Sequence, residues 1–273
     1  MDALEVLYED NHLLVVNKPA GIATMGAESG PTIHSMAADY LRRKYNKPGR
    51  VFVGIVSRLD TMTSGALVLA RTSKAASRLS AQFAAKTKSK TDPAKKHSGV
   101  AGNSTLAKHD TQSLTGDPRK IYLAVVEGEL ESSQAVLSDQ LRKDDTARRM
   151  RMVGPNATDS QLAELRYSVI DAEKHWSLVA VELMTGRKHQ IRVQFADRGH
   201  PVIGDRKYKS NRNFPAGIAL HSWQLQILHP TQRVPMWFEA PLPRSWKAFR
   251  KGSPESLKQR VADSLSLNFD GEA

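Results

Sequence analysis

The alternation of apolar and polar residues along this chain predicts short strands with a few helices between them. Short apolar or alternating runs bounded by turn residues predict strands at 13–16, 65–70, 121–127, 164–170 and 175–184, and a closing pair at 219–228 and 236–239. Apolar residues at helical spacing predict helices at 32–44, 74–85 and 189–197. Antiparallel strands interspersed with helices in this way indicate an α+β fold.

The strand predicted at 65–70 is apolar throughout, which is typical of a strand buried on both faces. Just before it stand Arg58 and Asp60, followed by the turn-forming residues Thr61, Thr63, Ser64 and Gly65. On an extended backbone, Arg58 and Asp60 project to the same side. Taken alone, an Arg-x-Asp pair at this place is also compatible with a surface salt bridge that caps the strand.

The charge balance indicates a polyanionic partner. The chain has 40 Lys and Arg against 28 Asp and Glu, a net charge of +12, and nucleic acid is the commonest partner of such a protein. The absence of cysteine excludes disulfides and thiolate metal sites. The first residues lack the pattern of a secretory signal, and no apolar run approaches 18 residues. We therefore expect a cytoplasmic protein without a membrane span.

Five sequence blocks, taken together, resemble the RluA-type RNA pseudouridine synthases of the RluA/RsuA family. The block Arg58-Leu-Asp-Thr-Met-Thr-Ser-Gly65 is similar to the active-site motif of that family, and the apolar strand follows it directly. The other blocks occur in the order of the family, from about residue 6 to about residue 245, and they are Val6–Gly21, Lys120–Gly128, Thr185–Arg192 and Gly199–Asp205.

The resemblance implies a fold and a reaction. The fold is the pseudouridine synthase fold, a mixed and mostly antiparallel sheet with flanking helices and a central cleft, here over residues 1–250. The reaction detaches uracil from C1′ of a uridine in structured RNA, rotates it and rejoins it through C5. This chemistry needs neither a cofactor nor a metal, and the nine histidines show no metal-binding spacing. We expect a monomer that acts on ribosomal or transfer RNA, and these two substrates stay open.

By resemblance, the catalytic residues are Asp60, Tyr122 and Arg192. Asp60 either adds covalently to the sugar or takes a proton from it, and the sequence does not decide between these routes. Arg192 pairs with Asp60 and supports its ionised form. Tyr122 stacks on the uracil or transfers a proton.

Further residues are expected to bind the substrate RNA. Arg58 matches the motif arginine that fills the gap left when a base leaves a helical stack. Arg187 and His189 are expected at the rim of the cleft, where phosphate contacts are plausible. The complete set of expected RNA-binding residues is Arg58, Thr63, Ser64, Gly65, Arg187, His189 and Ile191. Ser57 stands where many relatives have histidine, which bears on substrate selection and not on the catalytic aspartate.

Two segments lie outside the pattern of the family. Residues 86–119 are rich in Lys, Ser, Thr, Gly and Asp and are expected to be a flexible basic insertion, either a linker or an arm that contacts RNA phosphates. Residues 251–273 are expected to be a polar C-terminal tail, helical at first. The alternative to an enzyme is a non-catalytic RNA-binding protein that retained the fold.

Overall fold

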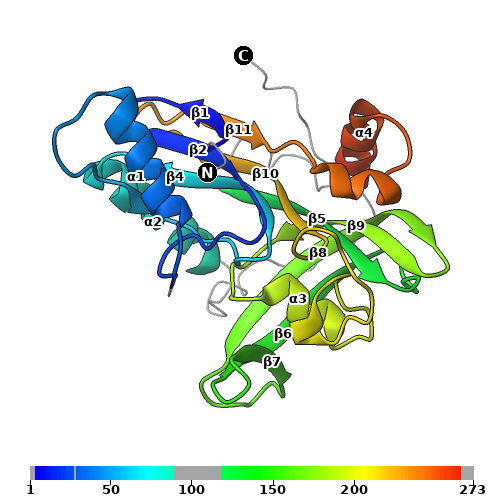
Figure 1. Ribbon diagram of the computed structural model, residues 1–273. Coiled ribbons are helices and arrows are strands. Elements are labelled where there is room, and N and C mark those ends of the chain that lie inside the picture. The colour runs from blue at the N-terminus through cyan, green and yellow to red at the C-terminus, as the bar shows by residue number, and fades with distance from the viewer. Residues whose placement is uncertain (1–3, 28, 89–117, 266–273) are drawn as a thin grey trace, which may run out of the picture.

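The computed structural model describes residues 4–27, 29–88 and 118–265, and an eleven-stranded sheet lies at its centre (Figure 1). From one edge to the other, its main path contains β1 (Val6–Glu9), β2 (Leu13–Lys18), β4 (Ser64–Ala70), β10 (Leu220–Leu228), β5 (Arg119–Glu127), β9 (Trp176–Leu183), β8 (Gln161–Glu173), β6 (Gln134–Asp144) and β7 (Arg149–Val153). Two short strands lie beside this path: β3 (Gly54–Ile55) pairs with β4, and β11 (Pro235–Glu239) pairs with β10.

The pairing between β4 and β10 is parallel, and every other strand pairing of the sheet is antiparallel. The predicted α+β class and the mixed, mostly antiparallel sheet are therefore confirmed. Gly65 lies at the parallel junction, opposite Ser222, with φ of +113°. A Cβ atom at Gly65 would overlap the backbone carbonyl of Ser222. The junction thus requires glycine both for its backbone conformation and for the close approach of β10.

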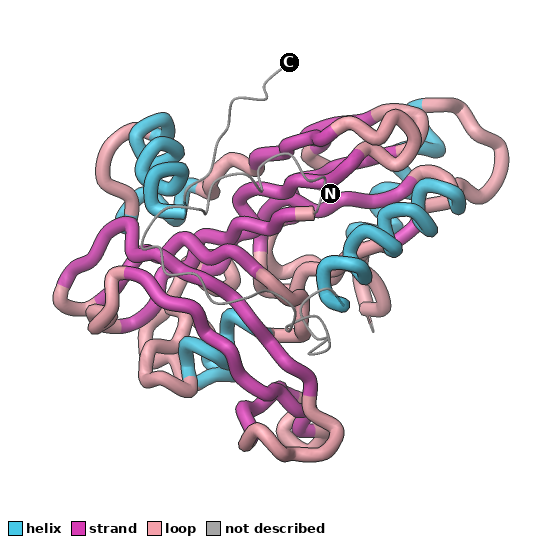
Figure 2. Tube along the Cα trace, turned by 180° about the vertical axis from the view of Figure 1, so that it is seen from behind, coloured by secondary structure: helices cyan, strands magenta, loops and turns pink. Residues whose placement is uncertain are grey.

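Two helices cover opposite faces of the half of the sheet that contains β1, β2 and β4 (Figures 1 and 2). Helix α1 (Ile33–Lys44) begins after Thr32, which caps it: the Thr32 hydroxyl accepts a hydrogen bond from Ser35 N at 3.1 Å. Its buried residues pack in the same cluster as Leu14, whereas those of α2 (Ser73–Lys88) pack with Leu13. Because successive strand residues point to opposite faces, α1 and α2 enclose β2 and β4 between them.

Helices also cover both faces of the other half, which contains β6, β8 and β9. On one face, Phe195 of α3 (Gln190–Ala196) contacts Tyr167 of β8, with ring centroids 5.3 Å apart. On the other face, Ser168 of β8 donates a hydrogen bond to Ser264 O of α4 (Pro254–Leu265) at 3.0 Å. The remaining helical turns are η3 (Arg206–Tyr208) and η4 (Arg244–Phe249). Within the described ranges, no helix has the length and apolar character needed to cross a membrane.

Several boundaries differ from the pattern in the sequence. Residues 144–153 lie outside the predicted strands but form the end of β6 and the strand β7, because their backbone pairs across a hairpin. Of the segment 86–119, expected to be a flexible basic insertion, residues 86–88 belong to α2 and Arg119 begins β5. Residues 89–117 lie outside the described residues. The expected polar tail contains α4, whose buried residues Leu257, Val261, Ala262 and Leu265 belong to the main core.

Candidate active site

A cleft of about 600 Å³ lies where the two halves of the sheet meet. Its walls come from the loop before β4, from β5, from the segment between β9 and α3, and from η3. A smaller cavity of about 60 Å³ adjoins it and shares Asp60, Tyr122 and Arg192 with it. The smaller cavity is also lined by the buried residues Thr63, Gln190, Ile191 and Leu220. The three predicted catalytic residues, Asp60, Tyr122 and Arg192, therefore line both cavities.

The loop that carries Asp60 is held by backbone contacts on both sides. Leu59 is buried, and its N–H and C=O both bond to the hydroxyl of Thr24, at 3.2 and 2.9 Å. Thr61 O accepts hydrogen bonds from Gly21 N at 2.8 Å and from Lys18 Nζ at 3.1 Å. Such contacts fix the position of the Asp60 backbone, so that its carboxylate is presented to the cleft before substrate arrives.

Arg192 links two carboxylates. Its Nη1 donates to Asp60 Oδ2 at 2.8 Å, while Nε and Nη2 donate to the two oxygens of Asp205 at 2.6 and 2.8 Å. Asp205 is fully buried, whereas a quarter of the Asp60 side chain is exposed. Burial alone would lower the pKa of Arg192, but the hydrogen bonds and charge of Asp205, together with the charge of Asp60, raise it. Arg192 therefore stays charged beside Asp60.

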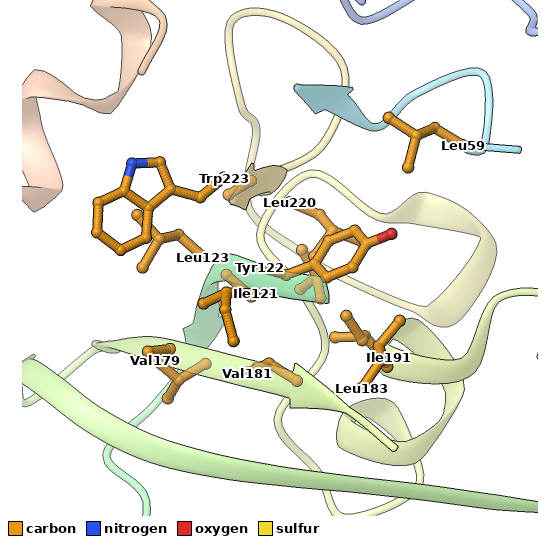
Figure 3. Packing of buried hydrophobic residues seen from close by; sticks show 14 of the residues in the cluster. Leu59, Ile121, Tyr122, Leu123, Val179, Val181, Leu183, Ile191, Leu220 and Trp223 are labelled. Atoms are coloured by element: carbon orange, nitrogen blue, oxygen red, sulfur yellow. The ribbon is translucent and has the colours of Figure 1, made fainter. Parts of the chain in front are cut away.

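Tyr122 projects from β5 into the cleft. Figure 3 shows its ring pointing away from Leu123 and Trp223, on the side of Leu183, Ile191 and Leu220. The side chain is buried, and burial raises the pKa of its phenol well above the usual value, while contact with the Ser222 hydroxyl works in the opposite direction. At neutral pH the hydroxyl therefore keeps its proton. It can donate a hydrogen bond but offers little base strength.

His189 precedes α3 with a left-handed backbone, at φ 54° and ψ 20°. Its Nδ1 lies 2.9 Å from the hydroxyl of Tyr208, and its Nε2 lies 3.8 Å from Asp60 Oδ2. Burial is the main cause that lowers the pKa of His189 to about 4; the charge of Asp60 opposes this shift, and the charges of Arg192, Lys188 and Lys207 add to it. The imidazole is therefore neutral at pH 7. Left-handed conformations of non-glycine residues are uncommon and cluster at functional sites.

Of the other expected RNA-binding residues, four line one or both cavities, and Ser64 and Gly65 line neither. Arg58, which is exposed, and Arg187 line both cavities, while Thr63 and Ile191 line only the smaller one. Burial lowers the pKa of Arg187, whose Nε donates to Leu162 O at 2.9 Å. Within the described residues, Thr63 Oγ1 is buried without a hydrogen-bond partner.

Ser64 and Gly65, which were also expected to bind RNA, line neither cavity. The Ser64 hydroxyl lies 2.8 Å from Nδ1 of the buried His221, and Gly65 packs against the backbone of Ser222. Both belong to β4, and the parallel pairing with β10 turns them toward the sheet. Their contribution is to the position of the loop that carries Asp60.

Three contributors to the site were missed from the sequence, although two of them lie in quoted blocks. Asp205 holds Arg192, and Tyr208 contacts both His189 and the Arg192 guanidinium, whose carbon lies 5.2 Å from the ring centroid. Lys18 is fully buried and donates to three backbone carbonyls, including Thr61 O. Burial lowers its pKa to about 8, while Asp60 opposes that change. The sequence blocks contain Lys18 and Asp205, but a block does not show which groups these two side chains contact.

The cleft is strongly cationic. Among the described residues, its lining includes one carboxylate, that of Asp60, and six Lys or Arg side chains: Arg58, Lys120, Arg187, Lys188, Arg192 and Lys207. The described part of the chain has no group of three or more metal-ligating side chains of the His, Cys, Asp and Glu type. A carboxylate at the centre of a cationic cleft is suited to chemistry on a polyanion, with phosphates bound around the reacting group.

The chain is similar to known proteins in both sequence and structure. The sequence profile of the family described as RNA pseudouridylate synthase matches residues 12–93 and 100–197. The uncharacterized RNA pseudouridine synthase YhcT of Bacillus subtilis is 32% identical over 245 residues, covering 89% of this chain and 70% of that protein. The ribosomal large subunit pseudouridine synthase C of Vibrio vulnificus is 33% identical over 245 residues, covering 87% of this chain and 65% of that protein.

A similar fold occurs among solved structures. Human RNA pseudouridylate synthase domain containing 4 matches with a TM-score of 0.65 at 20% identity, over 94% of this chain and 92% of that one. At this identity the likeness concerns the fold alone. The structural match and the sequence matches are all to RNA pseudouridine (pseudouridylate) synthases.

Proposed function

This chain belongs to the RNA pseudouridylate synthase family, and from that premise we propose that it converts uridine to pseudouridine in ribosomal RNA with Asp60 as the catalytic carboxylate. It is an isomerase, since uracil leaves C1′ and returns to it through C5. Family membership alone names neither the catalytic residues nor the class of RNA that is modified, and the proposal adds both.

One observation carries the assignment of Asp60. Its carboxylate lies where the two cavities meet, 2.8 Å from a guanidinium that is itself held by a second, buried carboxylate. The Arg192 fork restricts the orientation of Asp60 and favours its ionised form. Both routes open to the carboxylate, addition to the sugar and removal of a sugar proton, need this charge beside C1′.

The other two residues take complementary roles. Arg192 orients Asp60, and Tyr122 provides a protonated phenol and an aromatic face on the wall that β5 contributes to the smaller cavity. Arg58 lies at the exposed side of the same cavity, where it is suited to replace a base extruded from its stack. Together these groups bind and orient one nucleotide.

The proposed substrate class rests on the relatives and on charge. The Vibrio vulnificus relative is named for the large ribosomal subunit, and the cationic lining of the cleft suits a folded RNA with closely spaced phosphates. The proposal includes a monomer that acts in the cytoplasm. Mapping pseudouridine in ribosomal and transfer RNA with and without the gene tests the class: loss of a site in transfer RNA alone would contradict it.

Asp60→Asn tests the assignment of the catalytic residue. The variant keeps the shape of the side chain and removes its charge, so we expect RNA binding to persist and release of tritium from RNA carrying 5-³H-uridine to fall by at least ~10³-fold. Asp197→Asn makes the same chemical change at an exposed position outside both cavities and should retain wild-type release.

Two results of the tritium-release assay would contradict the proposal in different ways. Substantial release by Asp60→Asn, with mass spectrometry excluding deamidation to Asp, would remove Asp60 from the mechanism. A wild-type protein that binds RNA and releases no tritium from any RNA class would instead be the non-catalytic RNA-binding protein.

A further inference from the structure

We propose that His189 is the base that removes the proton from C5 of the re-joined uracil. This inference deepens the proposed function of the cleft and rests on it. It gives His189 a chemical role in place of the phosphate contact expected from the sequence.

The position of His189 suits a group that acts beside Asp60. Its side chain is only 8% exposed and lines both cavities. Nε2 lies 3.8 Å from Asp60 Oδ2, which is too long for a hydrogen bond. Within the described part of the chain, Nε2 has no other hydrogen-bond partner, so this nitrogen faces the place where a nucleotide reacts.

The hydroxyl of Tyr208 lets the imidazole adopt either tautomer. This oxygen accepts a hydrogen bond from Met150 N at 2.9 Å, and its own proton can go to His189 Nδ1 at 2.9 Å or to Met150 O at 3.2 Å. When the proton goes to Met150 O, His189 donates from Nδ1 to Tyr208 and Nε2 carries a free lone pair. The network therefore supports a basic Nε2 without moving any heavy atom.

The charges around His189 keep it unprotonated before substrate binds. Lys188 precedes it in the chain, Arg192 follows on α3, Lys207 and Tyr208 face it from η3, and Asp60 faces it from the loop before β4. Burial and the three cations lower its pKa, while Asp60 raises it. Phosphates that pair with Lys188 and Lys207 would cancel two of these cations and so increase the basicity of His189 once RNA is bound.

Neither of the other two candidates on the cavity walls is as well suited to accept this proton. Burial raises the pKa of Tyr122, so its hydroxyl is protonated at neutral pH. Asp60 is released from the sugar when C5 bonds to C1′, and its carboxylate then stays paired with Arg192 at 2.8 Å, which makes it a weak base. His189 is the neutral base that remains next to C1′, and C5 is bonded directly to C1′ after the uracil re-joins.

Removal of the C5 proton completes the conversion to pseudouridine. After C5 has bonded to C1′, C5 still carries its hydrogen, and N1 is joined to C6 by a double bond. The lone pair of His189 Nε2 takes the C5 proton, the C–H electron pair forms the C5=C6 double bond, and the C6=N1 pair moves to N1. N1 takes one proton from water, and the imidazolium returns one proton to water, so no other reactant is consumed.

His189→Asn is the main test, because Asn tolerates the left-handed backbone and can replace Nδ1 in the contact with Tyr208, but has no group at Nε2. We expect KM to change little and kcat for tritium release to fall by about 10²-fold or more. The isotope effect on kcat with 5-²H-uridine RNA should rise above the wild-type value, since C5 deprotonation becomes rate-limiting. His200→Asn, at a histidine outside both cavities that bonds Glu127 O, should match the wild type.

His189→Gly provides a second readout, since glycine suits φ 54° and leaves room for a free imidazole. Added imidazole should restore release to this variant and not to Asp60→Asn. The inference is overturned by wild-type kcat in His189→Asn, by a raised KM alone, or by a loss of kcat with an unchanged isotope effect and no imidazole rescue. A wild-type protein that releases no tritium would contradict the proposed function itself.

Discussion

Arg192 shows how one side chain acts through its geometry as well as its charge. Its guanidinium donates from three nitrogens to two carboxylates, and only one of these, Asp60, faces the cleft. A lysine has a single ammonium centre and no planar fork, so it cannot hold Asp205 in two bonds and Asp60 in a third at these distances. The orientation of Asp60 therefore depends on the fork.

For Arg192→Lys we expect partial loss of tritium release, and for Arg192→Ala nearly complete loss. Arg192→Ala also leaves Asp205 buried without a counter-ion, which should lower the free energy of unfolding by about 3–5 kcal/mol in urea. Asp205→Asn in the Arg192→Ala background should recover part of this stability without recovering activity. Equal activity of the Ala, Lys and wild-type proteins would show that Arg192 does not orient Asp60.

His221 is a second residue whose protonation state is set by burial. It is fully buried, with Nδ1 2.8 Å from Ser64 Oγ and Nε2 3.2 Å from Ala240 O. Burial lowers its pKa to about 4, against the hydrogen bond to Ala240 O, which raises it. In the unfolded chain the pKa of histidine is about 6.5. Between these values the unfolded state binds more protons than the folded state.

The free energy of unfolding should consequently fall as the pH is lowered from about 6.5 to about 4, and His189 adds to the same trend. Urea unfolding at pH 7, 6 and 5 measures this. His221→Asn, which keeps a polar group near Ser64, should be less stable at pH 7 and should show a weaker dependence on pH. An identical dependence in variant and wild type would assign the acid sensitivity to other groups.

Among the elements, the parallel contact of β4 with β10 has the largest consequence for the site. It joins the two halves of the sheet directly after the Asp60 loop, and it is possible because Gly65 has no side chain. A substitution here has to displace the backbone of Ser222, which belongs to the strand next to Tyr122. The geometry of both catalytic walls therefore depends on this contact.

Gly65→Ala should lower the free energy of unfolding by about 2–5 kcal/mol, since it combines an unfavourable positive φ with overlap against backbone. Tritium release should fall as well, because the Asp60 loop and β10 must move apart. Gly49→Ala is the control, as a Cβ there meets nothing within 4 Å and φ is not in the positive range; we expect it within about 0.5 kcal/mol of wild type. Wild-type stability of Gly65→Ala would mean that β4 and β10 do not approach so closely.

At the scale of the whole molecule, the chain has a net charge of +12, and the described lining of the cleft has six cations and one carboxylate. Binding of RNA there exchanges condensed counter-ions for Lys and Arg side chains. RNA affinity should therefore fall steeply with salt, and the logarithmic slope reports how many cations contact phosphate.

Between about 50 and 200 mM salt we expect affinity for a substrate RNA to drop by more than tenfold. Lys188→Gln, at an exposed position of the lining, should weaken binding and reduce the logarithmic salt slope by about 1. Lys174→Gln, an exposed lysine outside both cavities, makes the same change in net charge and should leave the slope as it is. A slope that responds equally to both would assign the dependence to the overall charge of the protein.

The amino-acid sequence alone determined the class of fold, most of the strands and helices, and the positions of Asp60, Tyr122 and Arg192 as candidates. These depend on local information: apolar periodicity, turn residues and short blocks in a fixed order. The strand β7 was not among the predicted strands, because its Arg-Met alternation spans only five residues and its pairing with β6 across the hairpin cannot be seen in the sequence. The helix α4 was foreseen as a helix and not as part of the core, since polar composition does not show which face a helix buries.

Only the tertiary structure decided which side chains meet. Asp60 and Arg192 are 132 residues apart in the chain, and Ser64 and His221 are 157 apart; no local pattern contains such distances. The closure of the sheet through β4 and β10 turned Ser64 and Gly65 away from the cleft, brought Asp205 behind Arg192, and placed Nε2 of His189 beside Asp60. The direction of a side chain depends on strand pairing and on helix packing across the whole sheet, and these are settled only when the halves join.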